Sequence, residues 1–479
     1  MTDAVVVGAG PNGLAAAVMM ARAGLQVEVF EAADTVGGGT RTKELLEPGH
    51  VYDVCSAVHP MALASPFFQA FELAQRVHFE VPELSFGSPL DGGRAALAFR
   101  SLERTAASLG FDGGAYSRLF APLVRRVAGV MDLTQNQLLR LPGDPMTAVL
   151  FAVRTLEQGS PLWNARFRGE AAPALMTGAA AHSVGRHPSL SATAAGLMLT
   201  TLAHAVGWPV PAGGSQAIAG AMEADIRTHG GEIHTGRRID SLGQLPAARV
   251  VLLDLAPAGF RSLAGDSLPA RYRRSLDTFR YGNGSCKVDF ILSGPVPWAA
   301  PELMDAGTVH VGGTRAEVAR AENEVAAGHH PEQPYVLVAQ PSRFDADRAP
   351  AGRHILWSYC HVPRGSTVDM SRAVIAQLER FAPGFRDLIV GYQVTTAAQL
   401  SGYNANYVGG DFSAGAMDLA GLIRRPVVSR VPWRTPLPGV YLCSSSTPPG
   451  PGVTGMPGYL AARQALADVF GKEVPSLAL

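Results

Sequence analysis

The stretch Ala4-Val5-Val6-Val7-Gly8-Ala9-Gly10-Pro11-Asn12-Gly13 decides the fold of this 479-residue chain. Its first residues predict a short strand, its glycines a tight turn, and residues 14–22 a helix. Gly8 allows the turn, Gly10 lets the backbone approach a pyrophosphate, and Gly13 lets the helix lie close to the strand. The helix N-terminus favours phosphate. The stretch therefore predicts a dinucleotide site that includes Gly8, Gly10, Pro11, Asn12 and Gly13.

A second predicted strand, residues 26–31, follows at once and ends in an acid. Glu31 lies 18 positions beyond Gly13, where an acid accepts both hydroxyls of an adenosine ribose. A glycine turn of this kind also occurs in ordinary βαβ units. The order of strand, turn, helix, strand and acid favours dinucleotide binding, with Glu31 at the ribose.

A second glycine cluster, Val36-Gly37-Gly38-Gly39-Thr40-Arg41-Thr42, stands shortly after Glu31. Nicotinamide-binding Rossmann domains do not need it. Flavin enzymes of the glutathione-reductase and amine-oxidase type do, because their longer cofactor requires another backbone contact and an arginine. The alternative is a surface turn with a solvated arginine. The cluster predicts FAD, held non-covalently because no His or Cys stands in a recognised flavinylation context, with contacts from Gly38, Gly39, Thr40 and Arg41.

Residues 439–458 contain a third small-residue turn, between a predicted strand and a predicted helix at residues 459–470. A second helix N-terminus can therefore point at the cofactor. Its dipole would favour the negative charge that reduced flavin carries near N1 and O2. The residues expected at the ribityl chain and the pyrimidine edge are Ser445, Gly452, Val453, Thr454, Gly455 and Met456.

These segments resemble the phytoene-desaturase-like branch of the flavin amine oxidase superfamily. The resemblance also rests on residues 56–68, 211–236 and 404–412. It implies an α/β fold: a glutathione-reductase-like FAD-binding Rossmann domain with an inserted α+β substrate domain. It also implies that Ile239 lies near the adenine, although a plain αβ unit without cofactor contact is an equal alternative. Ser444 and Pro448 depart from the family, which has glycine and histidine there.

The cofactor segments lie at both ends and in the middle of the chain, so we expect discontinuous domains. Residues 1–64, 206–284 and 426–479 are predicted to form the FAD-binding domain. Residues 65–205 and 285–425 are predicted to form the substrate domain with a helical lid. The first of these insertions reads as helical, with helices at residues 115–130, 146–157 and 191–205, and the second mixes strands with one helix at 371–381.

Composition narrows the class of protein. Apolar residues make up 47% of the chain, charged residues 17%, and forty basic residues balance forty acidic ones, so nothing favours nucleic acid. The absence of a long apolar run and a fold that begins at residue 4 predict a cytoplasmic protein without a transmembrane segment. The apolar face of Met146, Val149, Leu150 and Val153 could contact a membrane peripherally or contact the substrate, although such a face is more often core. The four cysteines form no CxxC pair. The thirteen histidines show no metal-ligand spacing except His329-His330, which is read as a loop, so no metal site is expected.

Two side chains are candidates for catalysis. Lys287 stands in Gly282-Asn283-Gly284-Ser285-Cys286-Lys287-Val288, which resembles the strand that carries the lysine near flavin N5 in monoamine and polyamine oxidases. An ammonium there could stabilise superoxide during reoxidation. The alternative is a lysine whose head reaches solvent. His59 could act as an acid or base, or be a structural histidine. Asp411 is expected to line the passage to the flavin or to cap a turn, and Tyr403 and Tyr407 are possible aromatic walls.

The predicted function is FAD-dependent dehydrogenation (desaturation) of an apolar small molecule by hydride transfer to flavin N5, with oxygen or a quinone as electron acceptor. Amine oxidation, double-bond isomerisation and a flavin-free escort-type binding protein are the alternatives. No second GxGxxG opens another βαβ unit. We therefore expect that neither NADH nor NADPH reduces the flavin quickly.

Overall fold

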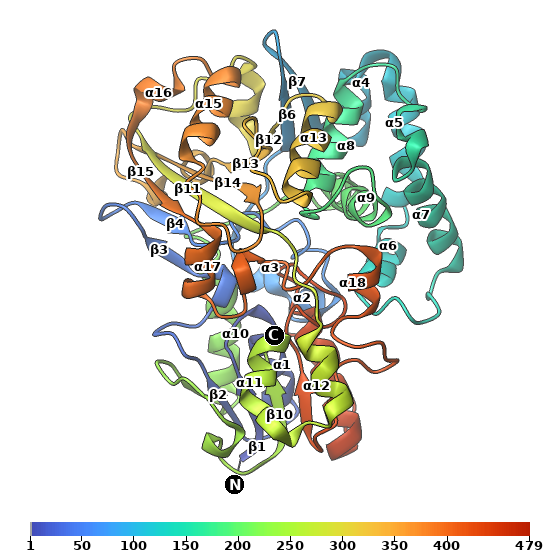
Figure 1. Ribbon diagram of the computed structural model, residues 1–479, viewed down its shortest axis with the longest axis vertical. Coiled ribbons are helices and arrows are strands. Elements are labelled where there is room, and N and C mark those ends of the chain that lie inside the picture. Colours follow the sequence, from blue (N-terminus) through green and yellow to red (C-terminus); the bar gives the residue numbers. More distant parts are fainter. Residues whose placement is uncertain (1) are drawn as a thin grey trace.

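The computed structural model describes residues 2–479 and has two parts stacked along its long axis (Figure 1). The lower part holds a five-stranded sheet in the order β16-β10-β1-β2-β9, in which every neighbouring pair is parallel. Its strands are β1 (Thr2–Val7), β2 (Val27–Phe30), β9 (Glu232–His234), β10 (Ala248–Leu253) and β16 (Val440–Leu442). This α/β architecture confirms the predicted fold class.

Strand β1 is central because its buried valines make it fit between two neighbouring strands. The chain leaves β1 toward β2 on one side, while β10 lies on the other. The carboxyl end of β1 is thus the place in an open parallel sheet where a crevice for ligands forms. The helices around this sheet are α1 (Pro11–Arg22), α2 (Pro66–Ala70), α3 (Leu73–Arg76), α10 (Gln216–Thr228), α11 (Pro257–Ala264), α12 (Ala270–Asp277) and α19 (Met456–Ala465).

Helix α1 is buried from Asn12 to Ala21 because it lies against both the sheet and α19. Two glycines permit these contacts. A Cβ at Gly13 would lie 2.0 Å from the Gly8 carbonyl oxygen, and a Cβ at Gly458 would lie 1.9 Å from the Asn12 carbonyl oxygen. A larger residue at Gly13 would push α1 away from the turn that it follows, and a larger residue at Gly458 would push α19 away from α1.

The upper part holds a seven-stranded sheet in the order β15-β11-β14-β13-β12-β6-β7. All neighbouring pairs are antiparallel except β12 and β6. Its strands are β6 (Leu84–Leu90), β7 (Arg94–Phe99), β11 (Gly284–Leu292), β12 (Ala306–Val311), β13 (Val336–Ala339), β14 (His354–Val362) and β15 (Ile389–Thr395). Two small ribbons complete the strands: β3 (Thr42–Glu44) with β4 (Val51–Asp53), and β5 (Phe79–Glu80) with β8 (Val210–Pro211).

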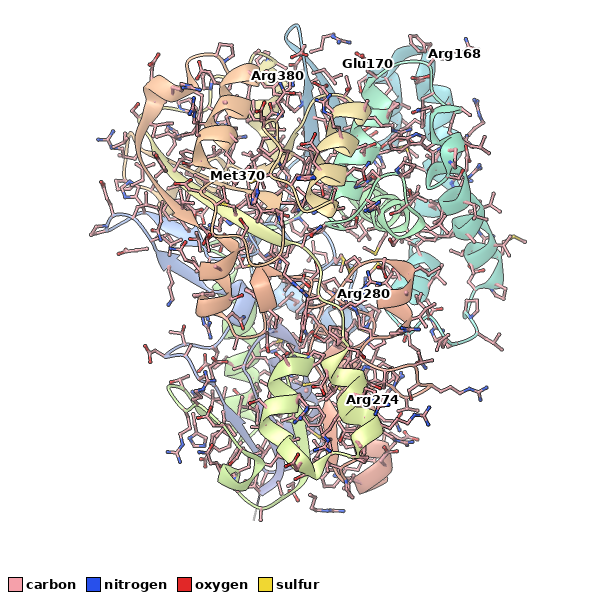
Figure 2. The ribbon with its side chains drawn as sticks, viewed as in Figure 1. Arg168, Glu170, Arg274, Arg280, Met370 and Arg380 are labelled. Carbon is pink, nitrogen blue, oxygen red and sulfur yellow. The ribbon has the colours of Figure 1, made fainter. Side chains whose placement is uncertain are left out.

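Helices cover the upper sheet and extend into a lobe at one side (Figure 1). They are α4 (Leu102–Ser108), α5 (Gly113–Val124), α6 (Val127–Thr134), α7 (Pro145–Gln158), α8 (Ala171–Ala181), α9 (Leu190–Ala205), α13 (Arg315–Ala326), α14 (Pro341–Phe344), α15 (Ser371–Phe381), α16 (Phe385–Leu388), α17 (Ala397–Tyr403) and α18 (Leu419–Ile423). Charged side chains such as Arg168 and Glu170 lie at the outer edge of this lobe (Figure 2). No helix within residues 2–479 is both long and apolar enough to span a bilayer. The residue boundaries of the two domains stay a prediction.

The sequence predicted that the first insertion is helical, but the structure shows that it also contains strands. It contributes the hairpin β6–β7, joined at Asp91-Gly92-Gly93, to the upper sheet. Both glycines of that turn adopt positive φ, as residues of tight hairpin turns do. This glycine pair was the signal in the sequence that could have predicted the hairpin. The helix predicted for 115–130 is also divided into α5 and α6, whereas α7, α9 and α15 lie where they were expected.

The outer face of α7 is a further correction. Core burial was the favoured interpretation for its apolar residues, yet Met146, Val149 and Val153 are 63%, 62% and 51% exposed. Phe151, on the opposite side of the helix, is the residue that packs inward. Apolar periodicity identifies one face of a helix but not what covers that face. Membrane contact through this face stays a prediction.

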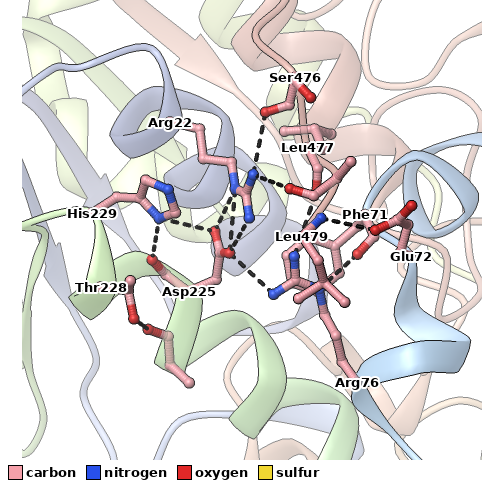
Figure 3. Close-up of polar contacts among 12 residues, drawn as sticks. Arg22, Phe71, Glu72, Arg76, Asp225, Thr228, His229, Ser476, Leu477 and Leu479 are labelled. Carbon is pink, nitrogen blue, oxygen red and sulfur yellow. Dashed lines mark hydrogen bonds and ion pairs between the residues drawn. The ribbon is translucent and has the colours of Figure 1, made fainter.

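The C-terminal tail is fastened to the lower part by a cluster of charges around Asp225 of α10 (Figure 3). Arg22 of α1 and Arg76 of α3 both contact this buried carboxylate, at 2.6 and 3.2 Å. Arg22 also donates to the carbonyl oxygens of Ser476 and Ala478. The charge cluster around Asp225 therefore connects α1, α3, α10 and the C-terminal tail, and it stabilises the packing of these elements in the lower part.

Candidate functional site

A cavity of about 680 Å³ runs from the carboxyl end of β1 into the upper part of the molecule. Its lower end is lined by the β1–α1 turn, the second glycine cluster and the small-residue turn before α19. Its upper end is lined by residues of α9, β12, β13 and β14 and of the loop after α17. The cavity thus joins the two sheets, which is where an inserted domain would present a substrate to a dinucleotide.

Most of the residues predicted to bind the cofactor line this cavity. They are Gly8, Gly10, Pro11, Asn12, Glu31, Gly38, Gly39, Arg41, Ile239, Ser445, Gly452 and Val453. Five predicted residues do not line it: Gly13, Thr40, Thr454, Gly455 and Met456. Thr40 and Thr454 instead support the turns, since Thr40 Oγ1 donates to the Gly37 carbonyl and the Thr454 carbonyl accepts from Ser65.

The two N-terminal glycine turns pack directly against each other. Gly8 has a φ of +96°, and the N–H of Gly37 donates to the Ala9 carbonyl over 2.8 Å. A Cβ at Gly38 would lie 3.0 Å from the Cα of Gly10. Larger residues would therefore separate the turns and fill the space beside the N-terminus of α1, where backbone N–H groups favour an anion.

Glu31 is held in place by its surroundings. One carboxylate oxygen accepts from the N–H of Ala9, and the other from the N–H of Ala33 and from the Arg41 guanidinium, at 3.0 Å. Arg41 also donates to the Thr35 carbonyl. Arg41 of the second glycine cluster therefore forms an ion pair with Glu31, the acid that follows β2. The two motifs, taken separately in the sequence, did not indicate this contact.

Asp254, at the end of β10, lies at the N-terminus of α1 and was missed in the sequence. Its Oδ2 accepts from the N–H of Gly13 over 3.0 Å, and a Cβ at Gly10 would lie 2.7 Å from the same oxygen. Burial raises the pKa of this carboxyl to about 7, against the opposing backbone hydrogen bond from Gly13. An acid that directly follows a buried parallel strand was the signal that could have identified it.

His59 lines the cavity and is neutral at pH 7. The hydroxyl of Ser215 donates to the Ser56 carbonyl, so it accepts from His59 Nε2, 2.7 Å away. This leaves His59 Nδ1 unprotonated and without a hydrogen-bond partner. Burial lowers the pKa of the imidazole to about 4. The side chain is therefore a hydrogen-bond acceptor and a weak base rather than an acid.

Lys287 does not line the cavity. It is buried in the middle of β11, where its ammonium pairs with Asp289. Nζ also lies 5.6 Å from the ring centroid of Trp357, and that indole does line the cavity. Burial raises the pKa of Asp289 to about 6 although Lys287 opposes the shift. The solvated alternative does not describe this lysine, and its catalytic role stays a prediction.

Of the remaining candidates, Asp411 caps a loop, and Tyr403 and Tyr407 form part of the cavity wall. Asp411 accepts from the N–H groups of Gly282, Ser413 and Gly415, so its carboxylate organises a loop. Tyr403 and Tyr407 line the cavity. A Cβ at Gly39 would lie 2.3 Å from the Tyr407 hydroxyl, which places this tyrosine directly over the second glycine cluster.

The upper end of the cavity is apolar and aromatic. Trp357, Tyr359 and Phe412 form a contiguous group, with edge-on ring contacts at 5.2 and 5.3 Å. The remaining apolar walls include Met61, Met198, Leu199, Trp208, Leu337 and Met417. Among the lining residues within 2–479, the acids are Glu31, Asp240 and Asp254, and they lie with the dinucleotide turns or beside Ile239. The upper end therefore offers no carboxylate to a cationic ligand.

Comparison with known proteins gives consistent findings. A family model described as "NAD(P)-binding Rossmann-like domain" matches residues 6–76. The chain is 25% identical to "Pyridine nucleotide-disulfide oxidoreductase domain-containing protein 2" of Rattus norvegicus, over 98% of this chain and 94% of the relative. It is 27% identical to the "zeta-carotene-forming phytoene desaturase" of Myxococcus xanthus, over 75% and 72% of the two chains.

Solved structures share the fold along the whole chain. A putrescine oxidase triple mutant superposes with a TM-score of 0.64 and 18% identity, and covers 98% of this chain and 99% of its own. An oxidoreductase from Methanosarcina mazei superposes with a TM-score of 0.59 and 16% identity, over 96% and 98% of the two chains. These likenesses extend over both sheets.

Proposed function

We propose that this chain, which is similar to a phytoene desaturase over 75% of its length and has the fold of the amine oxidases, binds FAD non-covalently and dehydrogenates an apolar organic substrate. FAD would supply the hydride acceptor, at N5, and would pass the electrons to oxygen or a quinone. The chain's own residues bind the cofactor, orient the substrate and exclude water.

The lower end of the cavity fits the dinucleotide. Turns at Gly10 and Gly38 leave the N-terminus of α1 open to a pyrophosphate, since any Cβ at Gly38 would close the space between them. The buried Oδ1 of Asn12, which lines the cavity, has no hydrogen-bond partner in the protein. Glu31 would accept the ribose hydroxyls, and Arg41 and Ile239 would contact the rest of the cofactor.

The apolar upper end is the observation that carries the substrate class. Trp357, Tyr359 and Phe412 exclude water, and no acid at that end could pair with an ammonium group. An uncharged apolar substrate is therefore favoured over an amine, because a buried cation without a partner is costly. Desaturation needs few side chains, since binding and orientation over the flavin supply most of the effect.

Anaerobic mixing tests this proposal. The purified protein should be yellow, release intact FAD on acid precipitation, and lose its flavin absorbance when an apolar substrate is added, with a product that has lost two hydrogens. Bleaching by amines alone would favour amine oxidation. Turnover without bleaching would favour isomerisation, and a colourless protein that does not take up FAD would contradict the flavin itself.

A further inference from the structure

A group of polar side chains interrupts the apolar wall at the upper end of the cavity. His182 and Ser183 directly follow α8, and Thr308 and His310 share one face of β12. The imidazoles of His182 and His310 meet through their Nε2 atoms at 3.0 Å. A Cβ at Gly178 of α8 would lie 2.7 Å from His310 Nδ1, so this glycine allows the close contact. His182, Ser183 and Thr308 line the cavity.

Two hydroxyls of this group are buried without a partner. Ser183 Oγ and Thr308 Oγ1 belong to residues that are 1% exposed, and neither makes a hydrogen bond. A buried hydroxyl without a hydrogen bond costs free energy, and such groups are rare in folded proteins. Because both residues line the cavity, a ligand in the cavity is the natural source of the missing hydrogen bonds.

The histidine pair adapts to either role. With Nε2 of His182 engaged by His310, only its Nδ1 is left for a ligand. If His182 donates to His310, that Nδ1 is an acceptor, and in the opposite tautomer it is a donor. Burial lowers the pKa of His182 to about 3 and that of His310 well below its usual value, so both rings are neutral.

The surroundings exclude a charged ligand group. The neighbours of the pair are Trp208, in edge contact with both imidazoles at 5.5 and 5.7 Å, Phe86 and Tyr335. Within residues 2–479, no hydrogen bond or ion pair joins a Lys, Arg, Asp or Glu side chain to His182 Nδ1, Ser183 Oγ or Thr308 Oγ1. A carboxylate or an ammonium would therefore be desolvated there without a counter-ion.

We propose that His182, Ser183 and Thr308 form a subsite for one uncharged oxygen group, a carbonyl or a hydroxyl, on an otherwise apolar substrate. This inference rests on the proposed function in that the same cavity receives the substrate. It makes the substrate an oxygenated molecule rather than a pure hydrocarbon. The hydrogen bonds also fix the substrate in one orientation, because the apolar walls alone would let it slide and rotate.

Calorimetric titration of the FAD-loaded protein tests the subsite without turnover. The probes are butylbenzene, butyrophenone, phenylbutyrate and phenylbutylamine, which share a phenyl ring and a short chain. Butyrophenone should bind about tenfold more tightly than butylbenzene, as expected for one or two hydrogen bonds. Thr308→Val and Ser183→Ala should each lower that preference about threefold to tenfold while leaving butylbenzene binding unchanged.

Thr200→Val is the matched control. Thr200 is also fully buried with an unpartnered Oγ1, but it does not line the cavity. This variant should keep the preference for butyrophenone. A preference that survives both Thr308→Val and Ser183→Ala, or tighter binding of phenylbutyrate or phenylbutylamine, would overturn the subsite. A normal preference in a protein whose flavin no substrate bleaches would keep the subsite and contradict the redox function.

Discussion

The two ends of the cavity are built in different ways. The lower end consists of backbone at the boundaries between strands and helices, with glycines that let turns and helices approach. The upper end consists of single side chains from α9, β12, β13 and β14 and from the segment that follows α8. Backbone sites need particular residues at fixed spacings, so they leave motifs in the sequence. Side-chain walls need only bulk and polarity, which many sequences supply.

The largest effect is expected at the lower end, from Glu31→Ala. This change removes the acceptor for the ribose hydroxyls and frees the Arg41 guanidinium. FAD affinity should fall by about 2–3 kcal/mol, or roughly 30-fold to 150-fold, as measured by fluorescence titration of apoprotein. Asp34→Ala, an exposed acid three positions further along the chain, is the control and should bind FAD normally. Equal affinities for the two variants would contradict the assignment of Glu31.

Asp254 is expected to make FAD binding depend on pH. Burial raises its folded-state pKa to about 7 from a model-peptide value near 4, so the folded protein holds this proton more tightly than the unfolded chain. The proton stabilises the fold fully below about pH 4, and that contribution is lost as the pH rises through about 7. A pyrophosphate at the same helix N-terminus would repel the carboxylate and favour its protonated form further.

FAD affinity of the wild-type protein should therefore weaken above pH 7, by up to about tenfold per pH unit. Asp254→Asn keeps an acceptor for the Gly13 N–H but carries no charge. This variant should bind FAD with little pH dependence, and more tightly than the wild type at pH 8. Dissociation constants at several pH values decide the matter, and a wild-type affinity that is flat between pH 6 and 9 would contradict the role of Asp254.

A smaller effect is expected at Lys287, which is buried in β11 beside Trp357 of the upper end. Lys287→Met should slow reoxidation of the reduced enzyme by oxygen several-fold, since it removes a positive charge that could stabilise superoxide. Reduction by substrate should change less, because the lysine lies outside the lining of the cavity. Stopped-flow measurement of both half-reactions separates these effects. Asp289→Asn, which removes the other member of the buried pair, is the control for loss of the pair itself.

How much the sequence could predict follows the same division. The sequence predicted most of the cavity lining at the β1–α1 turn and the second glycine cluster from backbone requirements, and Glu31 from its spacing to Gly13, although Gly13 and Thr40 do not line the cavity. Asp254, His182, Ser183 and Thr308 were not, because their roles arise only when β10, α8 and β12 are brought to one cavity. The exposed face of α7 was misjudged for a similar reason: periodicity does not tell whether another element packs against it.

The last prediction is that NADPH has no effect: it should not reduce, and so should not bleach, the flavin. The glycine turns that could hold a pyrophosphate, at Gly8 to Gly13 and at Gly37 to Gly39, meet at one helix N-terminus. Glu31 contacts Ala9 of the first turn and Arg41 just after the second. We therefore expect them to form one dinucleotide site, which FAD would fill. The upper end presents aromatic and apolar walls, with no glycine turn before a helix among its lining segments in residues 2–479. A nicotinamide needs its own anchored pyrophosphate to be held over flavin N5. Anaerobic stopped-flow mixing should therefore leave the flavin oxidised over seconds, while an apolar substrate bleaches it, and rapid bleaching by NADPH would mean that the upper end also accepts a dinucleotide.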